Sequence, residues 1–381
     1  MQPSRGGTSR GASLVSRRDS FHVPHAPEFV LSLSVPHNSG IAKIAPSRKE
    51  QAAAQTDSRL GRILRLLMDH ATVVVSGTKI AEEIGTTRSE VWRLIQQLRA
   101  LGVDIPGHPA TGYQLRAMPD LLLPDFLKPA LQGTLFGSRI DHYFKIGSTN
   151  TAAMAAAAAG APEGTVLLAE EQIAGRGRGD HTWHSVRSAG IYCSVILRPA
   201  LPPSDVLVLS LAAGLAVYSA VEQTGTSAKL DLKWPNDLLI NGQKFCGILT
   251  EMTAEATHVR HVVVGIGLNV NHRSFPTELQ GIATSLRLVS GTEWSRVELT
   301  TALLKSLDRE YRGLLEGGAG RESILRRFSE RSSYVRGKEI RVEDNPDLNG
   351  ITAGLDGQGF LQVQTSEGLR TVLSGTVWPR E

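Results

Sequence analysis

Cysteine is scarce in this chain: the 381 residues contain two, Cys193 and Cys246, without the spacing of metal ligands. Both lie in apolar, strand-like segments, so we expect buried, reduced thiols rather than a disulfide bond. The sequence thus offers no disulfide framework and predicts no metal site. Reduced thiols are typical of a cytoplasmic protein, and we predict that location.

Long apolar segments are also lacking. No run approaches the ~20 residues that a helix needs to cross a bilayer. Hydrophobic residues make up 41% of the chain, which is ordinary for a soluble globular protein. We therefore expect no association with a membrane.

A surplus of one charge sign is missing from most of the chain. The formal net charge is +4, but residues 1–50 hold seven Lys or Arg and three Asp or Glu and account for all of it. The whole-chain totals of 41 and 37 leave 34 basic and 34 acidic side chains for the other 331 residues. Nucleic-acid binding must therefore rest on a motif rather than on a general basic field.

Composition and periodicity predict four parts: a disordered tail (1–56), a winged helix-turn-helix (57–117), a catalytic domain (118–331) and a small β domain (332–381). The tail is rich in Ser, Arg, Pro and Gly and lacks periodicity. Its first twenty residues share the composition of an organellar transit peptide, but no amphipathic apolar face accompanies it. A plain disordered tail, or a start codon placed too early, is the preferred interpretation.

The second part combines three helix patterns with a hairpin pattern. The first helix has apolar residues at helical spacing: Leu60, Ile63, Leu64 and Leu67. A second helix follows Ser76 and ends at Gly85, and Thr87 with Glu90 predicts a capping box before a third. Two short strands after it, at 103–105 and 113–115, would complete a winged helix-turn-helix.

The third helix of this part would present polar and cationic side chains outward: Arg88, Ser89, Trp92, Arg93 and Gln96. Such groups can meet phosphates and base edges. The segment 57–117 nevertheless carries only eight basic against six acidic residues. DNA binding is favoured, and a winged helix that contacts protein or has lost its operator is the alternative.

The region from about 138 to 330 mixes strand and helix patterns. Strands are expected at 165–169, 190–198, 230–234, 238–240, 244–251 and 260–270, and helices near 150–160, 206–223, 297–315 and 321–330. Asn241-Gly242 between two strands predicts a hairpin. This adjacency favours a mixed or antiparallel sheet, hence an α+β fold class. Short β runs in 334–381 predict a small SH3-like β-barrel.

The most informative stretch is Gln-Ile-Ala-Gly-Arg-Gly-Arg-Gly at residues 172–179, with Trp183 four residues later. Glycine allows a tight, mobile backbone, and arginine offers a planar fork of donors that fits phosphate oxygens. The stretch predicts a loop that closes over a phosphorylated ligand. A solvated Gly/Arg linker is the alternative if the stretch is taken alone.

Three further motifs accompany the loop. Ser148-Thr149-Asn150 follows an expected strand at 143–146 and opens an alanine-rich helix, where these side chains can bind a polar ligand or only cap the helix. Lys233-Trp-Pro-Asn-Asp ends a strand with a cation suited to phosphate. Gly265-Ile-Gly-Leu-Asn-Val-Asn ends another strand in small residues and amides, a weak signal alone.

Together and in this order, these motifs and Gly-Ile-Leu at 247–249 resemble those of the biotin protein ligases. With a winged helix in front and a β domain behind, residues 57–381 are similar to the bifunctional bacterial form, the biotin operon repressor. The resemblance implies two steps: biotin and ATP give biotinyl-5′-adenylate, and a lysine of a biotin carboxyl carrier protein then attacks it. It also implies Mg²⁺ on the ATP phosphates, operator DNA as a partner and a homodimer.

The resemblance assigns roles by position. Biotin binding is implied for Ser148, Thr149, Asn150, Gln172, Gly175, Arg176, Gly177, Arg178 and Lys233. ATP or adenylate binding is implied for Arg176, Arg178, Trp183, Lys233 and Asn269. Lys233, Arg176 and Arg178 would be catalytic, and Gly77 through Gln96 match the DNA-contacting helices.

One departure follows the Gly-Arg core. Many bifunctional members continue with arginine, whereas this chain has Gly179, Asp180 and His181. The lost positive charge puts in doubt how tightly the loop retains the adenylate, and hence how well ligand binding drives dimerisation. A lipoate-type ligase and a metabolite-sensing transcription factor without catalysis remain alternatives; Lys233 argues against the second.

Overall fold

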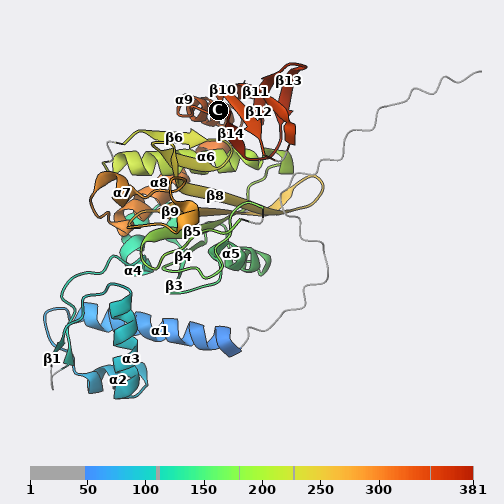
Figure 1. The fold of residues 1–381 in the computed structure, drawn as a ribbon. Helices are drawn as coiled ribbons and strands as arrows, with labels where there is room; N and C mark the ends of the chain where they lie inside the picture. Colours follow the sequence, from blue (N-terminus) through green and yellow to red (C-terminus); the bar gives the residue numbers. More distant parts are fainter. Residues whose placement is uncertain (1–47, 109–111, 180, 226–227, 344, 381) are drawn as a thin grey trace, which may run out of the picture. The chain divides into compact units, whose positions relative to one another are not determined.

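The structure is a computed structural model and describes residues 48–108, 112–179, 181–225, 228–343 and 345–380, without the side chains of 48–57 and 345–347. The predicted tail lies outside the described residues up to position 47. Its last nine residues, from Arg48, form the start of helix α1 (Figure 1).

The first helices form where local capping predicts them. The described chain begins with α1 (Arg48–Asp69), α2 (Gly77–Ile84), α3 (Arg88–Ala100), β1 (Gly107–His108) and β2 (Gly112–Tyr113). Ser76 caps α2, and Gly85 ends it with φ 69°. Thr87 accepts from the backbone N–H of Glu90 at 3.3 Å, but the Glu90 carboxylate turns to Arg93, so half of the expected capping box is present.

The wing is shorter than predicted and lies elsewhere. Val103 and Ile105, expected in a strand, are instead buried in the helical core, each 2% exposed. Tyr113 exchanges both backbone hydrogen bonds with Val75, at 2.8 and 2.9 Å, and the backbone of 103–105 keeps one hydrogen bond to the segment after β2, from Arg116 N–H to the Asp104 carbonyl at 2.9 Å. The burial of these apolar side chains decides their position over the β propensity of the segment.

A connector of short helices leads to the central sheet: α4 (Pro124–Leu127), η1 (Lys128–Leu131) and η2 (Leu135–Gly137). The sheet strands are β3 (Ile140–Tyr143), β4 (Val166–Ala169), β5 (Gly190–Leu197), β6 (Leu230–Lys233), β7 (Asp237–Ile240), β8 (Gln243–Ala254) and β9 (Val259–Asn269). Their order is β3-β4-β5-β9-β8-β7-β6, with β3 and β4 parallel and every other pair antiparallel. The predicted mixed sheet is therefore confirmed.

Two faces of this sheet have different cover. Helix α5 (Thr149–Ala158) packs on one face with Leu167 and Val263. The other face packs against α6 (Leu207–Gln223) and α8 (Arg296–Leu315) and supplies Leu168 and Val264 to the main core (Figure 1). Because successive side chains of a strand point to opposite faces, residues of β9 with the parity of Val263 face α5.

The remaining helices are η3 (Pro203–Asp205), α6 (Leu207–Gln223), η4 (Thr277–Leu279), α7 (Leu286–Ser290), α8 (Arg296–Leu315) and α9 (Gly318–Glu330). One described helical stretch, Pro203–Gln223, is long and apolar enough to cross a membrane by length and composition, but 78% of its apolar window is buried in the structure. The sequence analysis expected no apolar run of this length and therefore underestimated the apolar length of this stretch.

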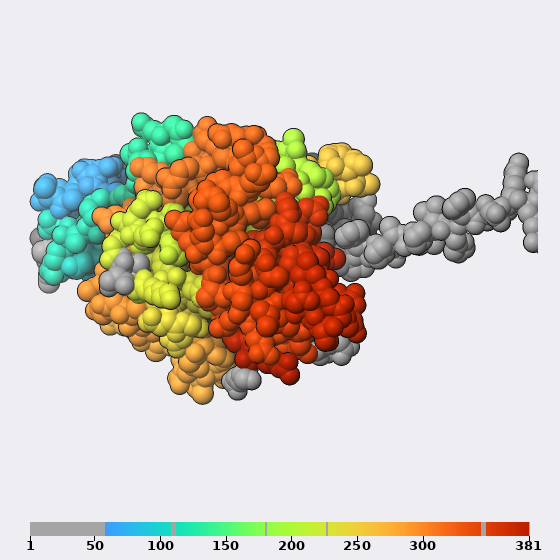
Figure 2. Space-filling view, turned by 90° about the horizontal axis from the view of Figure 1, so that it is seen from above, coloured from blue at the N-terminus to red at the C-terminus, as the bar shows by residue number. Residues whose placement is uncertain are grey.

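The C-terminal part is an antiparallel sheet, as predicted for an all-β domain. Its strands are β10 (Arg336–Val342), β11 (Asn345–Leu355), β12 (Leu361–Thr365), β13 (Gly368–Val372) and β14 (Val377–Pro379), in the order β13-β12-β11-β10-β14. Buried residues such as Ile340 and Leu361 join the same core as α6. Figure 2 shows this domain in red, directly against the orange residues that precede it.

Candidate functional site

The floor of the pocket beside the glycine–arginine stretch is made of glycine. Gly265 and Gly267 lie on the α5 face of β9, and Gly247 of β8 pairs with Gly267. A Cβ on Gly265 would lie 2.0 Å from Asn150 Oδ1, and one on Gly267 would lie 2.5 Å from the Trp183 ring. Glycines inside strands mark places where other groups approach the backbone closely. Here they let Asn150 and Trp183 approach the sheet.

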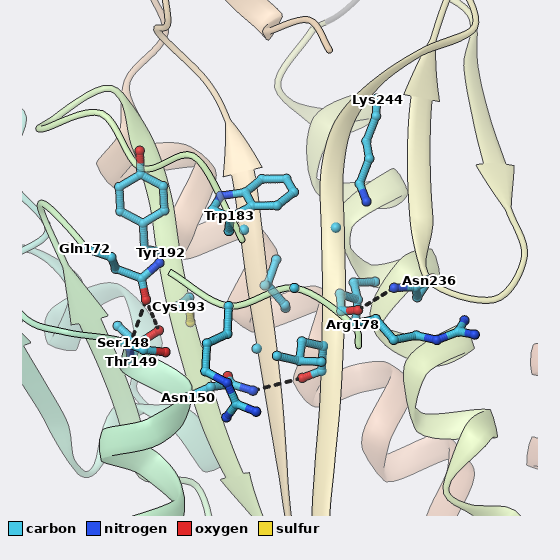
Figure 3. Close-up of a pocket in the computed structure, with 18 residues that line it drawn as sticks. Ser148, Thr149, Asn150, Gln172, Arg178, Trp183, Tyr192, Cys193, Asn236 and Lys244 are labelled. Carbon is cyan, nitrogen blue, oxygen red and sulfur yellow. Dashed lines mark hydrogen bonds between the residues drawn. The ribbon is translucent and has the colours of Figure 1, made fainter. Parts of the chain in front are cut away.

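The start of α5 forms one wall of this pocket (Figure 3). Ser148 caps the helix and lines the pocket together with Thr149 and Asn150, which are each only 4% exposed. Gln172 Oε1 accepts from the backbone N–H of Thr149 at 2.8 Å. Ser194 Oγ lies 2.7 Å from Asn150 Oδ1. These hydrogen bonds fix the orientation of the side chains at this wall.

The strand before this wall differs from the prediction. A strand was expected at 143–146, but β3 ends at Tyr143. Ile146 instead makes an isolated parallel bridge to Gln172, and its N–H donates to the Glu171 carbonyl. This pairing places Gln172 beside the α5 wall.

The glycine–arginine stretch folds as a loop across the pocket. The backbone N–H of Gly177 donates to the His181 carbonyl at 2.7 Å, and that of Trp183 donates to the Gly175 carbonyl at 2.9 Å. Gly175 itself lies outside the lining, and a Cβ there would lie 2.6 Å from the Trp183 carbonyl oxygen. Glycine is thus needed at 175 for the turn of the loop.

The two loop arginines have different partners. Arg176 forms an ion pair with Glu251 at 2.9 Å, and Glu251 also accepts from Asn150 Nδ2 at 2.9 Å. Arg178 Nη1 donates to the carbonyl of Gly375 in the C-terminal domain at 3.1 Å. Both arginines line the pocket. In this arrangement a carboxylate holds one guanidinium at the place where an anionic ligand would compete for it.

The lysine predicted to be catalytic lies at the border of this pocket rather than in its lining. Lys233 is 6% exposed, and its Nζ is 4.1 Å from the ring centroid of Trp378. Burial lowers the pKa of this ammonium, and nearby Lys244 lowers it further against the opposing charges of Asp237 and Glu343. A lysine in this setting is a candidate phosphate-binding cation whose charge depends on pH.

Asn269 also lies away from the pocket lining. Its Nδ2 donates to the Thr284 carbonyl at 3.1 Å, and the side chain is 4% exposed. In this structure Asn269 anchors the segment after β9. Its predicted adenine contact stays a prediction.

Sequence reasoning missed several lining residues. Lys244 lines the pocket, pairs with Asp237 at 2.7 Å and lies 5.6 Å from the centroid of Trp183 (Figure 3). Tyr192 and Asn236 line it as well. Lys244 follows the Asn-Gly hairpin and precedes the Gly-Ile-Leu motif, and this position between two motifs is a sequence signal that could have identified it as a lining residue. Nothing in the local sequence distinguishes Tyr192 from a core residue.

A buried ion-pair network lies beside the site. Arg296 is fully buried and pairs with Glu170 at 2.8 Å and with Asp120 of the connector at 3.0 Å. Burial alone would raise the pKa of Glu170, but Arg296, His142 and the N–H of Leu122 lower it to about 2. Glu170 stands two residues before Gln172, so this network fixes the base of the glycine–arginine loop.

The predicted DNA-binding face is exposed in the described winged helix. Trp92 is 58% exposed, Arg88 and Ser89 are exposed, and Gln96 is half-buried. Arg93 pairs with Glu90 at 2.6 Å, which neutralises part of its charge. Gly77 lies against the ring of Tyr113: a Cβ built on Gly77 would lie 3.5 Å from a ring carbon of Tyr113. The face therefore keeps Arg88 as an exposed cation and Trp92 as an exposed aromatic.

Both cysteines are buried free thiols, as predicted. Burial raises the pKa of Cys193 to about 12. No group of three His, Cys, Asp or Glu side chains suited to a metal occurs in the part of the chain that the structure describes. The pocket lining presents amides, hydroxyls and cations over the glycine floor.

Comparison with known proteins gives three family matches. Residues 145–269 match the biotin/lipoate A/B protein ligase family, residues 59–114 an HTH domain, and residues 336–378 the biotin protein ligase C terminal domain. The chain is 35% identical to the bifunctional ligase/repressor BirA of Bacillus spizizenii, over 83% of this chain and 97% of that protein.

Two further comparisons agree. The chain is 35% identical to the biotin–[acetyl-CoA-carboxylase] ligase of Mycobacterium tuberculosis, over 67% of this chain and 95% of that protein. The solved structure of the Aquifex aeolicus biotin protein ligase in complex with biotin and ATP superposes with a TM-score of 0.55 at 29% identity, covering 64% of this chain and 99% of that one.

Proposed function

The chain belongs to the biotin protein ligase family, in the form that carries an N-terminal HTH domain, and from this we propose that it joins biotin to ATP as biotinyl-5′-adenylate. It then transfers biotin to a lysine of a biotin carboxyl carrier protein. One observation carries the proposal: the α5 wall, Gln172 and both loop arginines converge over the glycine floor.

The polar wall suits the biotin ureido ring. Ser148, Thr149 and Asn150 with Gln172 present hydroxyl and amide groups in fixed orientations. Preoriented donors and acceptors bind a neutral polar ring without a further ordering cost. We assign biotin binding to this wall and to the adjoining loop from Gly175 to Arg178.

The cations suit the first chemical step. A biotin carboxylate must approach the α-phosphorus of ATP, and both groups are anionic. Arg176, Arg178 and Lys233 offset this repulsion and stabilise the charge that grows on the phosphoryl oxygens. The Arg176–Glu251 ion pair would open when the ligand competes for the guanidinium.

The loop suits the second step. The mixed anhydride is prone to hydrolysis, and a closed loop excludes water until the acceptor lysine arrives. Trp183 and, after movement of the segment beyond β9, Asn269 would cover the adenylate. Mg²⁺ would arrive on the ATP phosphates, since the described residues offer no metal cluster of their own.

The HTH domain gives the second activity, biotin-responsive repression of biotin-synthesis genes. The exposed α3 face, with Arg88, Ser89, Trp92, Arg93 and Gln96, would contact operator DNA. A homodimer formed through the central sheet would place two such faces on one operator. A protein with these two roles acts in the cytoplasm.

The decisive test is biotin-dependent exchange of ATP with labelled pyrophosphate by the purified chain. Exchange with biotin, and little with lipoate, is expected. Lys233→Met should reduce exchange several-hundred-fold, a loss on the order of 3–4 kcal/mol in transition-state stabilisation. Lys305→Met, at an exposed position of α8, is the matched control and should match wild type.

Failure of wild-type protein to exchange pyrophosphate with biotin would overturn the ligase proposal. Preference for lipoate would change the substrate but keep the reaction. Repression is tested separately, by the salt dependence of binding to the promoter of the chain's own biotin genes. Binding no tighter than to unrelated DNA would leave a ligase with an HTH domain of another use.

A further inference from the structure

A short segment of the C-terminal domain contacts two of the proposed site cations. Gly375 accepts from Arg178 Nη1 through its carbonyl at 3.1 Å. Three residues later, the ring of Trp378 lies 4.1 Å from Lys233 Nζ. Arg178 lies in the glycine–arginine loop and Lys233 at the end of β6, 55 positions apart in the sequence. The segment Gly375–Trp378 thus contacts both cations from the same side of the C-terminal domain.

The orientation of the Trp378 ring is fixed by its neighbours. Trp378 lies in β14 opposite Arg341 of β10, and the preceding residue, Val377, is fully buried. The Nε1 of Trp378 donates to Glu343 Oε2 at 3.1 Å. A ring held by a strand on one side and a hydrogen bond on the other presents its face to Lys233 in a defined place.

Lys233 is held from its own side as well. It is the last residue of β6, and the next residue, Trp234, donates through Nε1 to the Gly359 carbonyl at 2.9 Å. The ring of Tyr334 lies 5.7 Å from Lys233 Nζ. Two consecutive residues of the Lys-Trp-Pro-Asn-Asp motif therefore contact the C-terminal domain.

Two described carboxylates act on Lys233 through their charges, those of Asp237 and Glu343, and both have other partners. Asp237 forms its ion pair with Lys244 at 2.7 Å, and Glu343 accepts from Trp378. The ammonium of Lys233 thus lies on aromatic faces, which favour a cation without supplying a negative charge. A fixed carboxylate in the same place would cancel the charge that an anionic substrate group needs.

We propose that Trp378 is a positioning residue for Lys233: its indole face holds the ammonium at the pocket border, charged and without an ion pair to any carboxylate among the described residues, ready for the phosphate group of the nucleotide. Gly375 orients Arg178 toward the same place. This proposal rests on the role of Lys233 in the proposed function. It makes the C-terminal domain part of the adenylation machinery through an aromatic contact with the catalytic lysine.

The test uses the full chain with Trp378→Leu and Trp378→Phe. Leu369→Ala, at an exposed position of β13 in the same domain, is the control. Exchange kinetics give kcat and the KM values for ATP and biotin, and thermal melting checks the fold. Labelling with an amine-reactive reagent, followed by peptide mapping, reports the accessibility of Lys233 relative to Lys244.

With Trp378→Leu we expect kcat to fall about tenfold, with the KM for biotin unchanged. Lys233 labelling should rise several-fold over that of Lys244, as expected when a covering ring is lost. Trp378→Phe keeps an aromatic face and should restore most of both properties. The Leu369→Ala variant should behave as wild type.

The proposal is overturned if Trp378→Leu leaves both kcat and Lys233 labelling at the level of Leu369→Ala. It is also overturned if Trp378→Phe loses as much activity as Trp378→Leu without a change in labelling. If Trp378→Leu does not fold, Trp378→Tyr joins Trp378→Phe, and loss of activity in both decides against it. Full exchange by Lys233→Met would instead refute the proposed role of Lys233, while the labelling result would still judge the contact.

Discussion

The indole of Trp183 lies against Gly267 so closely that a Cβ built on this glycine would be 2.5 Å from the ring. Trp183 follows the glycine–arginine loop, and Gly267 belongs to β9. The contact therefore joins the loop to the floor of the pocket. It also explains why β9 carries glycine on this face, whereas Ile266 and Leu268, which flank Gly267 and point to the opposite face, are large apolar residues of the main core.

Gly267→Ala should displace Trp183 while the sheet remains intact. We expect exchange activity to fall on the order of 100-fold, since a misplacement of about 1 Å in a site has an effect of this size. The measurement is pyrophosphate exchange with a parallel change in tryptophan fluorescence. Gly313→Ala in α8, where nothing lies within 4 Å of the new Cβ, should keep activity and stabilise the helix by about 1 kcal/mol.

Arg178→Ala should weaken retention of the adenylate more than its synthesis. The side chain links the loop to Gly375, and its loss frees the loop to open. We expect pyrophosphate exchange to fall less than with Lys233→Met, and release of labelled biotinyl-adenylate, measured by rapid gel filtration, to be faster than in wild type. Adenylate retention equal to that of wild type would contradict the role assigned to the loop.

The pH dependence of the first step should reflect Lys233. Burial lowers the pKa of this ammonium below that of an ordinary lysine, so the charged form is lost as pH rises through the lowered value. Exchange activity should thus decline as pH rises, and the decline should begin at a lower pH than the ~10.4 expected for an ordinary lysine. Lys233→Arg, which stays charged throughout, should lack this decline; an identical alkaline limb in both proteins would assign it to another group.

The Arg296–Glu170 pair should matter for stability. Arg296→Met leaves a buried carboxylate without its main partner, and we expect a loss of about 3–5 kcal/mol in the free energy of unfolding. The measurement is urea unfolding at neutral pH. Arg326→Met, which removes a pair with Glu330 at the surface, should cost at most about 0.5 kcal/mol.

The same pair predicts an acid limb. The pKa of Glu170 is lowered to about 2, so its stabilising contribution is complete above the unfolded value of ~4.3 and declines as pH falls from there toward the folded value. Glu170→Gln should be less stable at neutral pH but should lose less stability between these two values. An acid dependence as steep as that of wild type would place the effect in other carboxylates.

DNA binding should depend on Arg88 and be limited by Glu90. Arg88→Ala removes an exposed cation and should lower the slope of log affinity against log salt by about 0.9 if it contacts a phosphate. Glu90→Gln removes the ion pair that holds Arg93 and should tighten binding. Fluorescence anisotropy on promoter DNA over a salt series measures both; unchanged slopes would exclude this face from the interface.

Local sequence alone predicted the features whose physics spans a few residues. Asn241 and Gly242 form the predicted hairpin turn with φ of 51° and 79° because these two residue types tolerate positive φ. Ser76 and Ser148 cap their helices because their side chains reach backbone N–H groups three positions on. The four motifs, and with them the family, were recognisable for the same reason.

Tertiary structure alone decided where the long polar side chains end. Lys233 lies on Trp378, Arg176 on Glu251, and Lys244 in the pocket where no motif placed it. Trp378 is more than a hundred positions from Lys233, and Glu251 is tens of positions from Arg176, so no local pattern encodes either contact. Val103 and Ile105 left the predicted wing because the helical core buried them. Backbone preferences act locally, whereas the destination of a side chain depends on which distant segments pack beside it.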